Sequence, residues 1–235
     1  MMSKVSALVV TRNRVDTLKR TIQYLKNQSY PISQIILVDN GSKDGTIDYL
    51  NNLKLPMEKK IIFQENLGGA GGFKKGLEIF LDSDSEWCWL MDDDGWPAKD
   101  ALENLHPENS EEPKWRNSIV LDKDNLDRLA FGLYFDGGLK ILKDDVVNFK
   151  IPIESCNPFN GTLLHRNLVY SIGLPIPEFF IKGDESEYQR RALRYGYKTE
   201  SYIKSYFFHP AHREPNIIDT ESSRIWVYYY KVRNI

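Results

Sequence analysis

The stretch VSALVVTRNRVDTLKRTIQYLKNQ, residues 5–28, combines the two patterns that decide the fold. Its first part, VSALVV, is a nearly continuous apolar run, which is typical of a strand buried on both faces. From Val15 onwards, apolar residues recur at intervals of three and four, which predicts an amphipathic helix. A buried strand followed by a helix is the repeating unit of a parallel sheet that helices cover on both sides.

The same alternation continues to the triple aspartate. Further strands are predicted for QIILVDN, KKIIFQEN and EWCWLMDDD, at residues 34–40, 59–66 and 86–94. Helical patterns lie between them, at residues 46–53 and 71–83. We therefore predict an α/β fold with a mostly parallel central sheet flanked by helices.

The second half of the chain is less regular. Strands are predicted at residues 118–122, 128–135 and 139–145, a strand or bend leading into a short helix at 159–175, and a helix at 183–197 that ends near Gly196. The residues Asp136, Gly137 and Gly138 are typical of a turn between two strands. The last residues, WVYYYKVRNI, have a helical pattern without a capping glycine or a polar tail. We expect a single domain, residues 1–235, cut from a longer protein.

Composition excludes some classes of function. The 235 residues are 41% hydrophobic and 27% charged, as in ordinary globular proteins, and the net charge of -2 provides no basic field for nucleic acid. No apolar run approaches the roughly 20 residues that span a bilayer. The N-terminus lacks the features of a signal peptide. Cys88 and Cys156 have no metal-binding spacing, which favours a reduced, cytoplasmic compartment.

Polar residues follow the ends of four predicted strands. They are Thr11, Arg12 and Asn13, then Asp39 and Asn40, then Asn66, and finally Asp92, Asp93 and Asp94. Ligands of open parallel sheets bind at the carboxyl ends of the strands. These positions therefore predict one binding site at that edge of the sheet.

The acidic run gives that site its chemistry. In an extended segment residues two apart point the same way, so Asp92 and Asp94 are expected to present carboxylates to one point. Carboxylate oxygens suit Mg²⁺ or Mn²⁺, and such an ion would offset the repulsion between the acids. The alternative is a solvated acidic turn.

The glycine-rich segment ENLGGAGGFKKG, residues 65–76, fits neither a P-loop nor a dinucleotide-binding fingerprint. Glycines before a helix allow close approach of the backbone to a ligand, or they form a flexible turn, and both interpretations stay open. Asp39, at a strand end, can accept a hydrogen bond from a base or a ribose. Helix capping explains Ser42 and Asp44 but does not require Asp39.

Acidic and histidine residues in the second half are further candidates. Asp184, Glu185 and Glu187 lie near a helix start, where the macrodipole favours acids, but where a general base is also expected. His209 and His212 follow an aromatic run. Either histidine is a structural residue or a metal ligand.

Taken in order, VVTRNR, ILVDNGSKDGT, ENLGGAGGFKKG and WLMDDDGWP resemble the motifs of family 2 glycosyltransferases with the GT-A fold. The resemblance covers most of the chain. The segments NLGGAGGF, FNGTLL, FFIKGDESEYQRR and YYYKVRN are most similar to those of bacterial galactofuranosyltransferases and rhamnosyltransferases. The resemblance implies a nucleotide-sugar-binding half, residues 1–98, and an acceptor-side half, residues 99–235.

The resemblance also implies roles for individual residues. Thr11, Arg12 and Asp39 would bind the nucleotide, with Asp39 at the pyrimidine, and Asn66 and Gly69 would line the donor pocket. In the same way, Asp92 and Asp94 would hold Mn²⁺ or Mg²⁺ on the diphosphate, Asp93 would lie at the sugar side, and His209 would complete the metal shell, with His212 as second choice.

The implied reaction is a single inverting displacement. Glu185 takes the position of the catalytic base in the family's acidic pair, and Asp184 is its rival because the pair departs from the usual order of acids. The implied donor is a UDP- or dTDP-linked sugar, and the acceptor is a glycan or lipid-linked glycan of the cell surface. From the cysteine usage and the net charge we expect a cytoplasmic protein without a nucleic-acid partner. Peripheral contact with the inner face of the membrane, through a part beyond residue 235, is a second expectation.

Two alternative functions are a sugar nucleotidyltransferase and an inactive nucleotide-sugar-binding scaffold. A sugar nucleotidyltransferase would need a basic glycine-rich loop near the first strand, and TRNRVDTLK is not one. A nucleotide-sugar-binding scaffold without activity would not need the acids at residues 92–94 and 184–187. Oligomeric state is left open.

Overall fold

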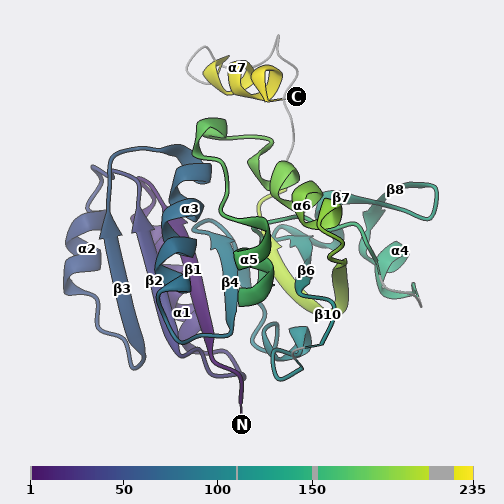
Figure 1. Cartoon of the computed structure of the whole chain (residues 1–235), viewed down its shortest axis with the longest axis horizontal. Helices are drawn as coiled ribbons and strands as arrows, with labels where there is room; N and C mark the ends of the chain where they lie inside the picture. The colour runs from purple at the N-terminus through teal and green to yellow at the C-terminus, as the bar shows by residue number, and fades with distance from the viewer. Residues whose placement is uncertain (1, 110, 150–152, 212–224, 235) are drawn as a thin grey trace.

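The computed structural model describes residues 2–109, 111–149, 153–211 and 225–234. Four parallel strands form the first half of its central sheet, as predicted. They are β1 (Val5–Thr11), β2 (Gln34–Asp39), β3 (Glu58–Phe63) and β4 (Trp87–Asp92), and they lie in the order β3-β2-β1-β4. Figure 1 shows that these strands point the same way, so their carboxyl ends share one edge.

The second half extends the same sheet beyond β4. The strands β9 (Thr162–His165), β6 (Trp115–Asp122), β10 (Thr199–His209) and β5 (Trp96–Pro97) follow in that order. Because β9 is antiparallel to both β4 and β6, the strand β6 and its parallel neighbour β10 run in the direction of β4. The carboxyl ends of β6 and β10 therefore lie at the same edge as that of β4.

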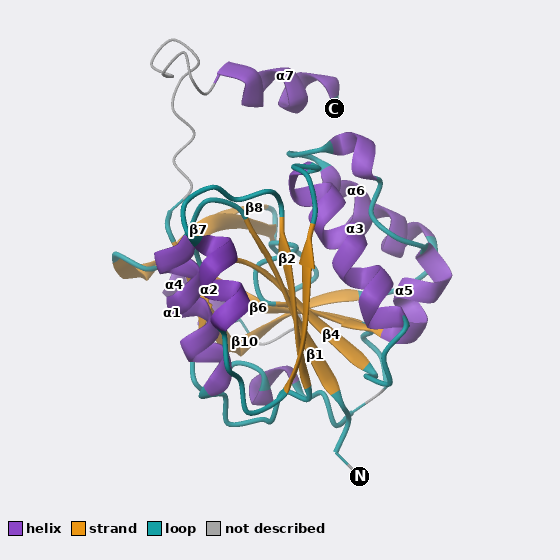
Figure 2. Cartoon of the chain, turned by 90° about the vertical axis from the view of Figure 1, so that its left-hand side faces the viewer, coloured by secondary structure: helices purple, strands orange, loops and turns teal. Residues whose placement is uncertain are grey.

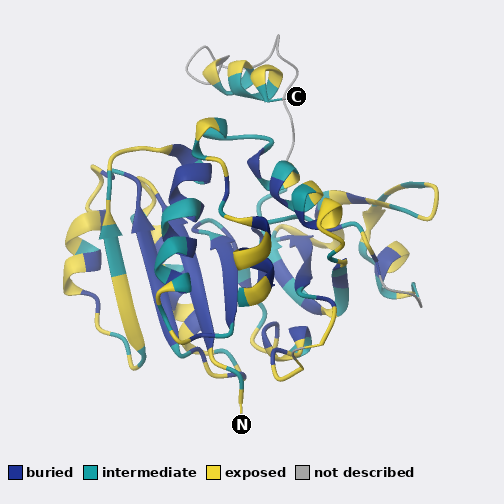
Figure 3. Cartoon of the chain, viewed as in Figure 1, coloured by how far each residue is buried: buried dark blue, intermediate teal, exposed yellow. Residues whose placement is uncertain are grey.

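Helices cover both faces of this sheet, as predicted, and Figure 2 shows the two layers. On one face lie α1 (Val15–Lys26) and α2 (Thr46–Asn52), and on the other lie α3 (Gly68–Leu81), α5 (Arg166–Ile172) and α6 (Asp184–Arg194). Alternate residues of the strands face the two layers: Ala7 and Val9 of β1 pack towards α1, while Leu8 and Val10 pack towards α3. Figure 3 shows that β1, β2 and β4 are buried along their lengths.

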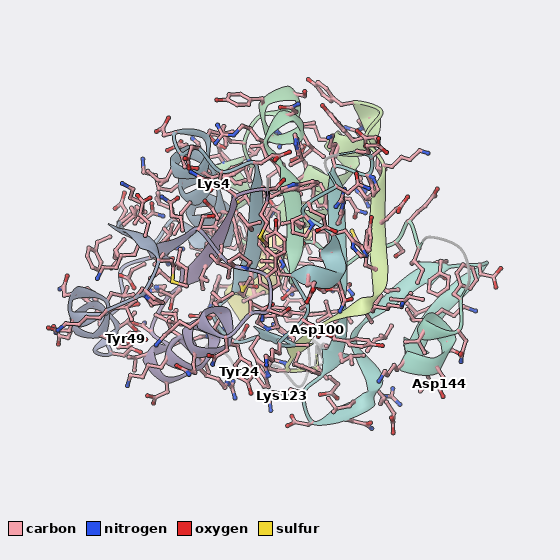
Figure 4. All side chains as sticks on the ribbon, turned by 90° about the horizontal axis from the view of Figure 1, so that it is seen from below. Lys4, Tyr24, Tyr49, Asp100, Lys123 and Asp144 are labelled. Atoms are coloured by element: carbon pink, nitrogen blue, oxygen red, sulfur yellow. The ribbon has the colours of Figure 1, made fainter. Side chains whose placement is uncertain are left out.

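A hairpin and a short helix extend the molecule beyond the sheet. The hairpin consists of β7 (Asn125–Phe135) and β8 (Gly138–Leu142), joined at Asp136 and Gly137, which both have positive φ. This is the predicted turn. The helix α4 (Lys143–Val147) packs against both strands. In Figure 4, Asp144 of this helix and Tyr49 of α2 lie at opposite ends of the molecule.

Three short or separate elements complete the structure. The 3-10 helices η1 (Glu103–Leu105) and η2 (Pro177–Phe179) precede β6 and α6, and α7 (Ile225–Arg233) lies near the C-terminus. Among the described helices, none combines the length and the apolar character that crossing a bilayer requires.

The structure corrects two sequence-based predictions and adds one strand. The strand predicted through 139–145 ends at Leu142, because Lys143–Val147 with its acidic first turn forms α4. The strand β10 was not predicted. The helix predicted from Gly71 begins at Gly68, so the alternative of a flexible glycine turn is wrong.

The glycines of α3 serve close packing on the sheet. A β carbon on Gly72 would lie 2.4 Å from a side-chain carbon of Val10, and one on Gly76 would lie 2.1 Å from Leu8. Real β carbons do not approach other atoms so closely. The glycine-rich sequence therefore brings α3 against β1 and fixes where the N-terminus of this helix lies relative to the edge of the sheet.

Candidate active site

The register of the sheet brings the predicted strand-end residues together. Thr11 pairs with Asp39 across β1 and β2, and Val10 pairs with Asp92 across β1 and β4. All three polar residues are therefore neighbours at one edge. This confirms that the polar residues at these strand ends converge.

Asp92, Asp94 and His209 form a group with the composition of a metal site. One ligand atom from each residue lies within 4.8 Å of the others. The chain turns at Asp93 and Asp94 directly after β4, so it is this turn, and not an extended segment, that aims both carboxylates at one point. His209, at the end of β10, reaches the same point, with Nε2 3.0 Å from a carboxylate oxygen of Asp94.

The pKa values of this group are shifted in opposite directions. Burial raises the pKa of Asp92 well above its ordinary value, and the charge of Asp94 raises it further. Although burial raises the pKa of Asp94, its close contact with His209 and the charges of His209 and Arg14 lower it on balance. Burial lowers the pKa of His209, but the contact with Asp94 and its charge outweigh it and raise this pKa.

A backbone hydrogen bond on the side away from the acids orients the ring of His209. Its Nδ1 lies 2.7 Å from the carbonyl oxygen of Pro210, which can only accept, so Nδ1 carries a proton and donates. This leaves Nε2 as the nitrogen that faces the acids. Backbone hydrogen bonds of this kind are what orient histidine ligands in metal sites.

Asp93 lies on the other side of the turn and is buried. Its carboxylate accepts hydrogen bonds from Thr11 Oγ1 at 2.6 Å and from Arg14 Nη1 at 3.1 Å. Burial raises the pKa of Asp93 to about 6, although the charge of Arg14 and the bond from Thr11 oppose the rise. Thr21 of α1 donates to the carbonyl oxygens of Asp93 and Gly95, which holds the turn in place.

Sequence reasoning missed Arg14. Its guanidinium pairs with both Asp93 and Asp94, so it is a resident cation of the acidic turn. The available signal was its position three residues after the end of a strand, beside the predicted site. Arg12, which was predicted, is exposed, and its backbone N–H donates to Asp93 at 3.4 Å.

Asp39 has an oxygen that is free to bind a ligand. The residue is fully buried, and its Oδ2 accepts from the N–H of Ser42 at 3.0 Å. Its Oδ1 is also buried, and among the described residues no group hydrogen-bonds to it. A buried acceptor without a partner is costly, so a ligand N–H or O–H is the expected partner. Nearby, exposed Asn66 accepts from the N–H of Gly68 at 3.2 Å.

The acids of α6 lie at the other side of the site. Asp184 is 4% exposed, and its Oδ1 has no hydrogen-bond partner in the described part of the chain. Burial, and then the neighbouring Glu185, raise the pKa of Asp184 far above its ordinary value. A β carbon on Gly69 would lie 3.9 Å from Asp184 Oδ2, so this acid lies over the first turn of α3. Glu187 is paired with Arg191 and is not available as a base.

Electrostatic interactions link Asp92 to the acids of α6. Glu185 contributes to the raised pKa of Asp92, and Asp92 contributes to that of Asp184. The acidic pair and the turn after β4 are therefore close enough to interact. The other candidate histidine, His212, lies outside the described residues.

Residues 6–124 match the sequence profile described as Glycosyl transferase family 2. The chain belongs to this family.

Curated members of family 2 match most of the chain. Galactofuranosyltransferase GlfT1 of Mycolicibacterium smegmatis is 29% identical over 217 residues, which cover 88% of this chain and 70% of that protein. GlfT1 of Mycobacterium tuberculosis strain H37Rv is 31% identical over 218 residues, with 89% and 71% covered. The family assignment confirms the predicted glycosyltransferase and sets aside the nucleotidyltransferase alternative.

Solved structures of glycosyltransferases share the fold. The GalNAc-T7 structure with UDP, GalNAc and Mn²⁺ superposes with a TM-score of 0.64 at 17% identity over 97% of this chain and 48% of that chain. The mannosyltransferase PcManGT from Pyrobaculum calidifontis, with GDP-Man and Mn²⁺, gives 0.63 at 16% identity over 93% and 60%. At these identities the likeness shows the fold alone, and it confirms the predicted GT-A fold. This chain spans about half of the GalNAc-T7 chain.

The side chains of Asp92, Asp94 and His209 are suited to bind a divalent cation. Two carboxylates and an oriented imidazole converge, and the carboxylates repel each other. A cation there would remove that repulsion and would compete with the contact between His209 and Asp94. The residues present are thus suited to Mn²⁺ or Mg²⁺.

Proposed function

We propose that this chain transfers a hexosyl group from a nucleoside-diphosphate sugar to a hydroxyl group of a glycan or lipid-linked glycan, with inversion at the anomeric carbon. Galactofuranosyl and rhamnosyl groups are the first candidates. The observation that carries the proposal is the convergence of Asp92, Asp94 and His209 beside the acids of α6. The likeness to galactofuranosyltransferases over most of the chain supports the choice of sugar.

The acceptor class is supported by a further relative. A Campylobacter jejuni protein, 27% identical over 170 residues and covering 70% of this chain, is named GalNAc(5)-diNAcBac-PP-undecaprenol beta-1,3-glucosyltransferase. A lipid-linked glycan is therefore a reasonable acceptor to test here. Contact with the inner face of the membrane, and the division into a donor half and an acceptor half, are parts of the same proposal.

The donor is held by the first half of the chain. Asp39 Oδ1, buried and without a partner among the described residues, accepts the imide N–H of a uracil or thymine ring. Asn66 and Gly69 lie where α3 begins, beside the site, and Thr11 with Arg12 borders it at the end of β1. This arrangement favours UDP or dTDP over CDP, because the cytosine ring lacks that N–H.

The leaving group needs positive charge. Asp92, Asp94 and His209 would hold Mn²⁺ or Mg²⁺, which would supply charge to stabilise the departing nucleoside diphosphate. Arg14 and Thr11 fix Asp93, and through it they fix the turn that carries both metal-binding carboxylates.

The proton step belongs to the acidic pair. Glu185 takes the proton of the acceptor hydroxyl, whose oxygen bonds to the anomeric carbon while the bond from that carbon to the diphosphate oxygen breaks on the opposite face. Burial raises the pKa of Asp184 to about 9, which favours its protonated form at neutral pH and makes it the less suited of the two to accept this proton. The partly exposed Glu185 is therefore the better base, and Asp184 is its rival.

A transfer assay tests the proposal. The protein is incubated with UDP-galactofuranose or dTDP-rhamnose, Mn²⁺, and a glycan acceptor on a lipid or an alkyl chain. We expect nucleoside diphosphate release that depends on the acceptor, and a product whose anomeric configuration is opposite to that of the donor by NMR. Nucleotide binding without transfer to any acceptor would instead favour the inactive scaffold.

A further inference from the structure

The segment that leads into the acidic pair has an unusual backbone. Phe180 has a φ of 63°, Lys182 has 65°, and Gly183, which directly precedes α6, has 89°. Residues with a side chain rarely adopt this left-handed region. Two of them within three positions persist only if the surroundings hold them there.

Asn234, directly after α7, provides such a hold. Its side-chain Nδ2 lies 2.9 Å from the carbonyl oxygen of Phe179, 3.1 Å from that of Ile181 and 2.6 Å from that of Lys182. The amide has two hydrogens, which these three acceptors share. One side chain therefore gathers the carbonyl groups of the segment around a single point.

Neighbouring residues of α7 strengthen this contact. Arg233 donates to the carbonyl oxygens of Glu178 and Phe179. The ring of Tyr230 stacks on that of Phe180, with centroids 4.8 Å apart and planes 23° apart. Figure 1 shows α7 above the loop that leads into α6.

The other side of the same segment rests on α3. The carbonyl oxygen of Phe180 accepts from the N–H of Ala70 at 3.2 Å. A β carbon on Gly68 would lie 2.0 Å from that oxygen, so only glycine permits the approach. The segment is thus fixed between the start of α3 and the end of α7, and Asp184 follows it directly.

We propose that Asn234 is a positioning residue for the acidic pair Asp184 and Glu185. It acts by holding residues 179–183 in the conformation, with positive φ at Phe180, Lys182 and Gly183, that starts α6 over the first turn of α3. This inference rests on the proposed function, since it takes this pair as the source of the base. It adds that the end of α7 helps to position the acidic pair, although α7 lies outside the sheet and its two helix layers.

The test compares Asn234→Asp with Asn52→Asp. The first variant keeps the shape of the side chain but replaces the N–H donors with a carboxylate that the three carbonyl oxygens repel. The second makes the same change at the end of α2, where exposed Asn52 donates to the carbonyl oxygen of Asp48 at 2.8 Å. Asn234→Ala is the milder variant if Asn234→Asp does not fold.

Two readouts are measured in the full chain. The first is steady-state transfer together with the Kd of UDP in Mn²⁺: we expect kcat to fall roughly 10- to 100-fold in the Asn234 variant, as misplaced catalytic groups do, while the Kd stays within about twofold. The second is amide hydrogen exchange of peptides that contain Ala70 and Ile181, which we expect to become faster in the Asn234 variant alone.

The outcomes separate this inference from the proposed function. An unchanged kcat, an equal loss of UDP affinity, or unchanged exchange at Ala70 and Ile181 would overturn the positioning role. If the wild-type protein transfers no sugar, the proposed function fails, and the exchange experiment alone decides whether Asn234 holds the segment.

Discussion

The imidazole Nε2 of His209 lies 3.0 Å from a carboxylate oxygen of Asp94, which joins the end of β10 to the turn after β4. The two strands are separated in the sheet by β9 and β6. The contact therefore depends on the turn at Asp93 and on the correct pairing of the whole second half of the sheet. The site can therefore form only when both halves of the sheet are folded.

Replacing Asp94 tests the metal-binding assignment. We expect Asp94→Ala to weaken Mn²⁺-dependent UDP binding by at least about 100-fold, because a direct ligand matters more than the outer-shell groups whose loss costs 10- to 100-fold. Calorimetry in Mn²⁺ and in EDTA measures this, and circular dichroism checks the fold. Retained Mn²⁺-linked affinity in a folded variant would rule out the assignment.

Replacing the acids of α6 one at a time identifies the base. Glu185→Gln should keep UDP binding and lose transfer by roughly 100-fold or more, within the range that general base catalysis provides. Single-turnover transfer and UDP affinity are measured together. Normal transfer by Glu185→Gln, combined with loss in Asp184→Asn, would identify Asp184 as the base.

Asp184 should also lower the free energy of unfolding above acidic pH. Burial raises the pKa of Asp184 in the folded state far above 3.8. Below about pH 4 this carboxyl group is protonated in both the folded and the unfolded protein. As the pH rises towards the folded-state pKa, ionisation of Asp184 in the unfolded chain favours unfolding increasingly. Asp184→Asn, which cannot ionise, should therefore stabilise the fold at about pH 7 by roughly 1–3 kcal/mol and have little effect near pH 4. Denaturant unfolding at both pH values measures this, and equal effects at both would contradict it.

Arg14 should stabilise the acidic turn mainly when no cation is bound. We expect Arg14→Gln to reduce stability in EDTA by about 1 kcal/mol, a modest value because the side chain is half exposed and solvent screens its charge. With saturating Mn²⁺ and UDP the loss should shrink, since another cation then compensates the acids. Thermal unfolding under both conditions measures this. An equal loss of stability in EDTA and in Mn²⁺ with UDP would contradict the prediction.

The glycines of α3 offer a test of the packing. Gly76→Ala should destabilise the fold by about 1–3 kcal/mol, because the added carbon overlaps the side chain of Leu8. Gly138→Ala is the matched control, since a β carbon there meets no atom within 4 Å. A Tm of Gly76→Ala equal to that of the control would show that α3 does not lie so close to β1.

The first half of the fold and its strand-end residues could be predicted because the buried strands are nearly continuous apolar runs that end in a polar residue, as in Val5–Thr11 and Gln34–Asp39. The strand β10 could not, since charged residues such as Glu200 and Lys204 interrupt its pattern, and an irregularity lies between Tyr202 and Tyr206. Long-range pairing in the second half is set by packing rather than by local pattern.

Some residues of the site could be predicted from the sequence and others could not. Asp39 and Asp92 are predictable because a polar residue at the end of an apolar run stands out. Arg14 resembles an ordinary exposed cation before an amphipathic helix, and only its partners reveal it. Asn234 lies in the segment YYYKVRN that carries part of the resemblance, but its hydrogen bonds to the segment before Asp184 could not be predicted, because its acceptors are backbone carbonyl groups of a distant loop.

The most direct measurement is the thermal stability of the protein with UDP, dTDP, GDP or CDP, each in Mn²⁺ and in EDTA. A ligand that binds only the folded state raises the Tm, by an amount that grows with its concentration relative to its Kd. The account predicts a rise with UDP or dTDP that requires Mn²⁺. No Mn²⁺-dependent rise with any of the four nucleotides would contradict it and leave Asp92–Asp94 as an acidic turn without a ligand.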